Sequence, residues 1–145
     1  MPPDPPSPSP LAGEGRGGGT SGTADEDLTP RSFSRRVDGF RHAVSGGLWL
    51  APLVYLESAR FGPGWYGKVV SADAQRLLRW AATRGIPVRA LQQKSLPDVD
   101  GGPRGHRQRI PAYHIDLWGA RLALAYDPEL LARLRARPVS SARLP

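Results

Sequence analysis

The chain has no cysteine and no long apolar run. Without cysteine, disulfides, thiolate catalysis and cysteine-ligated zinc are all excluded. No apolar stretch approaches the roughly 20 residues of a transmembrane helix. The first residues are proline-rich and acidic, and they lack the basic stretch followed by an apolar one that marks a signal peptide. We therefore expect a cytoplasmic protein with no membrane partner.

Acidic residues are scarce after residue 30, where 19 basic residues face 8 acidic ones, a net charge of +11. A charge of this size attracts polyanions. However, 18 of the 20 basic residues are arginine, and a chain rich in arginine, alanine, glycine and proline is also typical of a GC-rich genome. Composition therefore predicts nucleic acid or a nucleotide as a partner, with a protein partner or none as alternatives. The oligomeric state stays open.

Large apolar side chains are also few in residues 1–30, which are rich in proline and glycine. Prolines remove backbone donors, and glycines and small polar residues bury little, so we predict a disordered head. A start codon assigned too far upstream is an alternative, because Met1 is the only methionine. Residues 31–46 are expected to form a basic linker or a short helix. A single compact domain is expected over 47–137, followed by a tail over 138–145.

Within this domain the apolar pattern predicts strands over 53–57, 65–70 and 86–92. Between the last two, apolar residues at helical spacing predict an amphipathic helix over 73–84, with Asp73 as a candidate cap. A strand–helix–strand unit with a short return implies that its two strands pair in parallel.

The C-terminal half begins with a long polar loop over 93–109, followed by the apolar stretch 110–126. Gly119 could turn a hairpin, or the residues after it could be helical; the hairpin is favoured. Asp127 followed by proline predicts a C-terminal helix over 128–137. The fold class is thus α/β, a small mixed sheet of three to five strands with one central amphipathic helix and one C-terminal helix.

One short stretch combines an imidazole, a carboxylate and a guanidinium, on His114, Asp116 and Arg121. In an extended segment, side chains two residues apart point to the same side. Ile115 and Leu117 would then face the core while His114 and Asp116 face the other way. His114 could act as a general base or acid, and Arg121 could bind phosphate. A hydrogen-bonded structural histidine and an ion pair are the alternative.

Further candidates come from strand ends and from the polar loop. Glu57 follows a predicted core strand, where α/β folds place functional groups, with a surface glutamate as the alternative. Together with Asp73 and Asp116 it could hold Mg²⁺ or Mn²⁺ for phosphodiester chemistry, beside His114 and Arg121 at the same edge of the sheet. The densest basic cluster lies in the loop and could contact phosphate in a non-enzymatic adaptor; it contains Arg104, Arg107 and Arg109.

Residues 53–126 resemble a small uncharacterised family of bacteria and phages, domain of unknown function 4031. The matching pieces are Val54-Tyr55-Leu56-Glu57-Ser58-Ala59-Arg60, Ala72-Asp73, Gly85-Ile86, Leu91-Gln92 and His114-Ile115-Asp116-Leu117, with Arg121 at a basic position. The chain departs from the pattern at Glu57 and Ser58, where the family has two aspartates, and at Lys68, where it has histidine. The resemblance implies an α/β fold and a site near His114 but no particular activity.

Overall fold

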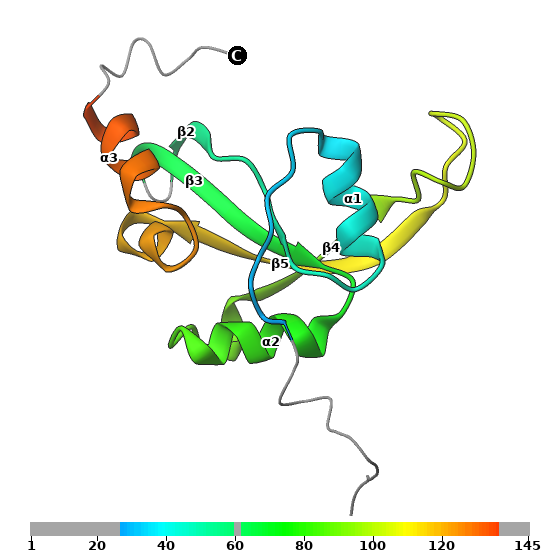
Figure 1. The fold of residues 1–145 in the computed structure, drawn as a ribbon, viewed down its shortest axis with the longest axis horizontal. Helices are drawn as coiled ribbons and strands as arrows, with labels where there is room; N and C mark the ends of the chain where they lie inside the picture. Colours follow the sequence, from blue (N-terminus) through cyan, green and yellow to red (C-terminus); the bar gives the residue numbers. More distant parts are fainter. Residues whose placement is uncertain (1–26, 60–61, 137–145) are drawn as a thin grey trace, which may run out of the picture.

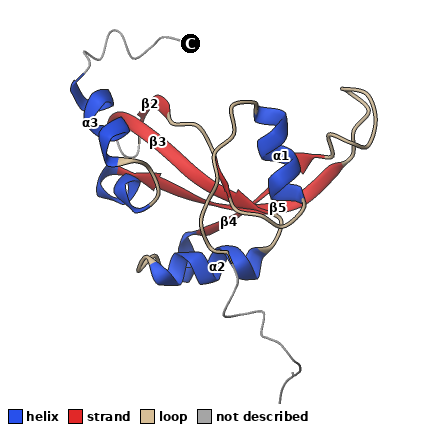
Figure 2. Ribbon diagram, in the orientation of Figure 1, coloured by secondary structure: helices blue, strands red, loops and turns tan. Residues whose placement is uncertain are grey.

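The computed structural model describes residues 27–59 and 62–136, and shows a five-stranded sheet with helices on both faces (Figures 1 and 2). Most of the predicted head over 1–30, and the whole tail over 138–145, lie outside the described residues. In chain order the elements are α1 (Arg36–Val44), β1 (Trp49–Leu50), β2 (Val54–Ser58), β3 (Gly62–Ser71), α2 (Ala74–Thr83), the 3₁₀ turn η2 (Val88–Ala90), β4 (Leu91–Pro97), β5 (Arg109–Trp118), the 3₁₀ helix η3 (Gly119–Leu124) and α3 (Pro128–Ala136).

The α/β fold, the amphipathic helix and the C-terminal helix are confirmed. The side chain of Asp73 accepts a hydrogen bond from the backbone N–H of Arg76 at 3.0 Å and so caps α2. Asp127 does the same for Leu130 at the start of α3, at 3.2 Å. None of the described helices is long and apolar enough to cross a membrane.

The strand order corrects one prediction about the sheet. Its order is β1-β3-β5-β4, with β2 also beside β3, and the ladders between these strands are all antiparallel. The two strands that flank α2 do run in the same direction, but β5 lies between them and pairs with both. The predicted parallel pairing, and with it the mixed sheet, is therefore wrong. The cause is a later strand, β5. It pairs with both β3 and β4 and therefore lies between the two strands that flank α2.

The strand after α2 begins later than predicted. The apolar stretch predicted as a strand over 86–92 instead forms a turn at Val88–Ala90, where the N–H of Ala90 donates to the carbonyl of Pro87 at 3.0 Å. The strand itself is the polar segment Leu91–Pro97, so the loop before β5 is shorter than the predicted 93–109. Because β4 is an edge strand with several exposed side chains, its pattern lacks the apolar signal of a core strand.

The predicted hairpin after Gly119 is also wrong. Gly119 takes a positive φ of 58° and begins η3, in which Leu122 is buried. The N–H of Tyr126 donates to the carbonyl of Leu122 at 2.9 Å, which places the tyrosine ring back against the sheet. This packing leads directly into α3.

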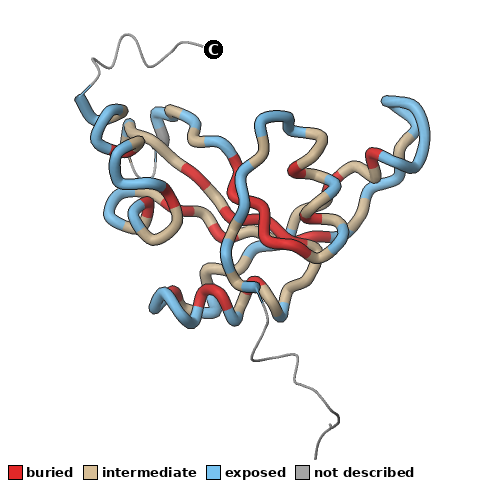
Figure 3. The backbone as a smooth tube through the Cα atoms, viewed as in Figure 1, coloured by how far each residue is buried: buried red, intermediate tan, exposed pale blue. Residues whose placement is uncertain are grey.

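The sheet separates two apolar clusters, visible as the buried centre of the molecule in Figure 3. The larger contains Val69, Ile115 and Leu117 under α2, η3 and α3, and the smaller lies between the sheet and α1. As predicted, alternate residues of β5 serve opposite faces, since Ile115 and Leu117 are fully buried on the α2 side. His114 and Asp116 therefore face the α1 side.

Strands β1 and β2 run one after the other along the same edge of β3, with a bulge between them. Leu50 pairs with Val69 and Val54 pairs with Tyr66, so the edge carries one extra residue around Pro52. The break leaves backbone groups without hydrogen-bond partners in the ladder, and the buried hydroxyl of Tyr126 bonds to two of these groups. It donates to the carbonyl of Ala51 at 2.6 Å and accepts from the N–H of Lys68 at 3.1 Å.

Candidate functional site

A cavity of about 420 Å³ opens on the α1 side of the sheet. Its walls come from α1, from the bulged edge of the sheet and from the central strands β3 and β5. This volume lies within the roughly 300–1,000 Å³ typical of small-molecule sites. The cavity is therefore the candidate functional site. Two of the residues predicted from the sequence, His114 and Asp116, line it.

His114 and Asp116 form a hydrogen-bonded pair inside the cavity. Nδ1 of His114 lies 2.9 Å from Oδ1 of Asp116, and only 12% of the histidine side chain is exposed. A carboxylate can only accept, so Nδ1–H donates, and in the neutral imidazole Nε2 then carries the lone pair. Hydrogen bonding from His114 lowers the pKa of Asp116, so the carboxylate stays charged at neutral pH. The pair therefore holds a histidine with one nitrogen free to take or give a proton.

Both lysines of the chain lie in the same cavity, Lys68 on β3 and Lys94 on β4. Lys68 is opposite Asp116 in the ladder, and Lys94 is opposite Ala112, two residues before His114. Burial and the neighbouring ammonium of Lys68 lower the pKa of Lys94 to about 8, against the opposing effect of Asp116. The two lysine side chains thus interact with one another in the cavity that also contains the His114–Asp116 pair.

Aromatic rings form much of the remaining wall. Phe40 of α1 and Trp49 of β1 meet edge to face at 5.3 Å between ring centroids, and Tyr66 and Trp118 line the cavity from the sheet. At the edge of the sheet, Val54 and Leu56 line it and are 42% and 50% exposed. The site therefore offers flat apolar walls beside two amines, a combination suited to an aromatic ring that carries an anionic group.

Glu57 lies outside this site. Val54 and Leu56 face the cavity, so the alternation along β2 turns Tyr55 and Glu57 to the other face. The ring of Tyr55 indeed meets Trp65 at 5.5 Å, and Trp65 packs against the α2-side cluster. Asp73 is likewise outside the cavity, where it caps α2.

Arg121 lies next to the cavity and not in its wall. Its guanidinium carbon is 5.8 Å from the centre of the Trp118 ring, and Trp118 does line the cavity. This is a cation–π contact between Arg121 and Trp118. The sequence-based roles of Arg121, as a phosphate ligand or as the ion-pair partner of Asp116, have no contact to support them in the described structure.

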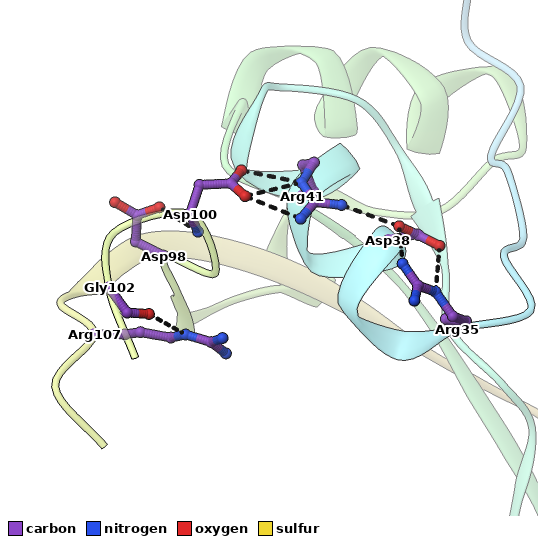
Figure 4. Close-up of polar contacts among 7 residues, drawn as sticks. All are labelled: Arg35, Asp38, Arg41, Asp98, Asp100, Gly102 and Arg107. Carbon is purple, nitrogen blue, oxygen red and sulfur yellow. Dashed lines mark hydrogen bonds and ion pairs between the residues drawn. The ribbon is translucent and has the colours of Figure 1, made fainter. Parts of the chain in front are cut away.

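Arg104, Arg107 and Arg109 do not line the cavity. Arg104 and Arg107 lie in the loop between β4 and β5, where Figure 4 shows Arg107, and Arg109 begins β5. Arg107 donates to the carbonyl of Gly102 at 3.0 Å, Arg109 donates to Ser95, and Arg104 is exposed. Acidic residues are interspersed, and Asp100 forms an ion pair with Arg41 of α1 at 2.9 Å. The loop is therefore a mixed-charge segment attached to α1.

The arrangement does not fit the predicted Mg²⁺ or Mn²⁺ site. Among residues 27–59 and 62–136, no three His, Asp or Glu side chains come close enough to hold a metal ion. His114 and Asp116 supply only two ligands, and the two lysine amines beside them repel a cation. An anion suits the cavity better.

The sequence-based prediction missed the two lysines. They lie 26 residues apart and meet only because β5 pairs with both of their strands. One signal was present, namely that an arginine-rich chain contains lysine at these two positions alone.

Comparison with known protein families, with curated proteins and with solved structures found no match. The resemblance of residues 53–126 to domain of unknown function 4031 therefore stays a prediction.

Proposed function

We propose that the cavity binds a small phosphate-containing ligand of the nucleotide class, and that His114 exchanges a proton with it. The observation that carries the proposal is the convergence of both lysines of the chain with the His114–Asp116 pair in a single cavity. Of the described residues that line the cavity, Asp116 alone is a carboxylate, while Arg36 adds a third cation. The excess positive charge favours a ligand with phosphate oxygens.

The aromatic walls support a nucleotide over inorganic phosphate. A base could lie against Trp118 or Tyr66, both of which line the cavity beside Lys68. Stacking of a base on an aromatic ring contributes about 1–3 kcal/mol in nucleic-acid complexes. The ring contacts and the amines together would therefore bind the two ends of a mononucleotide.

His114 is suited to proton transfer because Asp116 fixes its orientation and tautomer. With Nδ1–H bound to the carboxylate, Nε2 would accept a proton from an attacking hydroxyl or water, or return one to a leaving oxygen. The lysines would stabilise the negative charge that develops on the phosphate. Proton transfer by His114 and charge stabilisation by the lysines would together support phosphoester chemistry without metal ligands.

The binding half of the proposal is tested by tryptophan fluorescence, since Trp49 and Trp118 line the cavity. Adenosine monophosphate is titrated into the full chain and into Lys68→Met, Lys94→Met and Arg89→Gln. We expect each lysine change to weaken binding at least tenfold, because it removes a charge from the site. Arg89→Gln removes one exposed charge outside the cavity, and should change the affinity less than twofold.

Equal weakening by all three changes, or no saturable binding by the parent chain, would contradict the proposal. Equal weakening would point to non-specific attraction, as expected for the basic adaptor, and a salt-dependent DNA shift lost in an Arg104→Gln, Arg107→Gln variant would then identify it.

The proton-transfer half is tested with p-nitrophenyl phosphate and its diester. His114→Gln should abolish hydrolysis while nucleotide binding stays within threefold of the parent affinity. Absence of hydrolysis by the parent chain, or hydrolysis unchanged in the variant, would contradict the proton-transfer role of His114 and leave the binding proposal standing.

A further inference from the structure

We propose that Lys94 is a nucleophilic amine that forms an imine with an aldehyde or ketone bearing an anionic group. The inference deepens the proposed function and rests on it in one respect: the anionic group would occupy the position proposed for phosphate. It adds a covalent step and a narrower class of ligand.

The residue type is the first argument. The chain uses arginine for 18 of its 20 basic side chains and lysine for the two that meet in the cavity. Arginine binds phosphate at least as well as lysine does, but it does not lose its proton in proteins. Lysine differs because its neutral form is a nucleophile. The two lysines thus lie in a cavity where a deprotonated amine could attack a bound ligand.

The surroundings of Lys94 favour its neutral form. Burial and the ammonium of Lys68 both disfavour the charged amine, and Arg109 acts in the same direction, while Asp116 alone opposes them. Among the described residues, the other ionisable groups in the wall are Arg36, Tyr66 and His114. With a pKa of about 8, roughly a tenth of Lys94 is neutral at pH 7. A lysine next to a second cation is an established way to activate an amine.

The His114–Asp116 pair offers the proton transfers that the step needs. The lone pair of Lys94 Nζ forms a bond to the carbonyl carbon, and the carbonyl π electrons pass to oxygen, which takes a proton from water and leaves hydroxide. The nitrogen loses a proton to Nε2 of His114, and His114 returns it to the carbinolamine hydroxyl, so that the C–O bond breaks and water leaves as nitrogen forms the C=N bond. The iminium gives its N–H proton to the hydroxide, and the products are an imine and water, with no change of oxidation state.

The choice of an anionic carbonyl compound follows from the other cations. Lys68 and Arg36 remain in the wall when Lys94 reacts, and each would bind a phosphate or a carboxylate. The ligand is therefore a phosphorylated aldehyde or ketone, or a 2-oxo acid.

Pyridoxal 5′-phosphate is a suitable probe, because it is an aromatic aldehyde with a phosphate. The full chain is incubated with it, reduced with borohydride and mapped by mass spectrometry. We expect Lys94 to be labelled at least tenfold faster than Lys68 and the α-amine of Met1, with a pH midpoint near 8. Lys94→Arg should lose this adduct, whereas Lys68→Arg should keep it because the neighbouring charge is retained. Labelling at equal rates on all three amines would overturn the inference.

Two further measurements separate this inference from the proposed function. Lys68→Met should shift the labelling midpoint of Lys94 upward by at least half a pH unit, and an unchanged midpoint would contradict the activation by Lys68. Inorganic phosphate should slow labelling by the phosphorylated aldehyde. Nucleotide binding without a reducible adduct on Lys94 would remove the inference and leave the proposed function. Specific labelling of Lys94 that phosphate slows, in a chain that shows no saturable binding of adenosine monophosphate, would support the inference and contradict the proposed nucleotide class. Labelling that phosphate does not slow would contradict the anionic group in the inference.

Discussion

Asp116 determines which ring nitrogen of His114 donates, and the contact favours the charged form of the carboxyl. The hydrogen bond from Nδ1 at 2.9 Å keeps the pKa of the carboxyl below its ordinary value of 3.8. A carboxyl whose pKa is lower in the folded chain stabilises the fold above its unfolded pKa. It loses that contribution as the pH falls through the folded value.

Asp116→Asn tests this contact through the pH dependence of stability. The variant should be less stable than the parent chain at pH 6–7 by about 1 kcal/mol, the value of one hydrogen bond to a charged group discounted for partial exposure. The difference should shrink as the pH falls below about 4. Urea unfolding between pH 2.5 and 7 measures it. A difference that is constant over this range would show that the pair does not titrate as described.

Lys94 contributes in the opposite direction, because folding makes its charged form less favourable. Its pKa is about 8 in the folded chain and 10.5 in the unfolded one. The unfolded chain therefore binds the proton more tightly, and stability rises with pH between these values. Functional groups held in this way commonly lower the stability of the fold.

Lys94→Met should accordingly be more stable than the parent at pH 7, by about 1 kcal/mol after allowing for solvent screening of a half-buried amine. The advantage should disappear as the pH rises from about 8 to 10.5. Thermal unfolding at pH 7, 9 and 10.5 compares the two chains. A variant that is less stable than the parent at pH 7 would mean that the lysine stabilises the fold.

At the level of elements, the site depends on the bulge between β1 and β2 and on the residues that support it. Tyr126 bridges Ala51 and Lys68 across the bulge, and Gly67 makes room for its ring. The bulge residues line the cavity on one side of the sheet, while Tyr126 approaches from η3 and α3. Burial raises the pKa of Tyr126 to about 12, so the bridging hydroxyl stays protonated and able to donate at any physiological pH.

Tyr126→Phe removes this bridge without changing the packing of the ring. It leaves the carbonyl of Ala51 and the N–H of Lys68 without a partner, which should cost about 1–3 kcal/mol. Tyr113→Phe is the matched control, because the Tyr113 hydroxyl has no hydrogen bond within the described part of the chain, and it should change stability by less than about 0.5 kcal/mol. Chemical unfolding of both variants decides the matter, and equal effects would mean that the bridge contributes nothing.

Gly67→Ala should have a larger effect than Gly64→Ala in the same strand. A Cβ at Gly67 would overlap the ring and hydroxyl of Tyr126, whereas one at Gly64 meets nothing within 4 Å. We expect the first change to cost at least about 2 kcal/mol and the second to be neutral or slightly stabilising. Melting temperatures of the two variants measure this, and similar values would exclude the close approach.

Elements in which apolar residues recur with a clear period could be predicted from the sequence. Elements defined by a contact between distant parts of the chain could not. The predictions of the helix over 73–84 and of the alternation of Ile115 and Leu117 are confirmed, because each pattern reflects burial on one face. Strand β4 is polar because it is at an edge, and η3 forms because Leu122 and Tyr126 pack against the sheet. Neither cause is visible in the local sequence.

For the whole molecule, the insertion of β5 between β3 and β4 is what assembles the site. It places His114 and Asp116 between the strands that carry Lys68 and Lys94. The sequence could indicate the histidine and the aspartate, which are neighbours in the chain. Apart from the rarity of lysine in the chain, it could not indicate the two lysines, because their meeting depends on strand order. It also suggested Glu57, which the alternation of β2 turns away.

The most direct test of the account is a crystal structure of the full chain with adenosine monophosphate bound. We predict phosphate oxygens within hydrogen-bond distance of the amines of Lys68 and Lys94, and the base against the aromatic wall of the same cavity. Phosphate bound only to the loop arginines, with the cavity unoccupied at saturating ligand, would contradict the account.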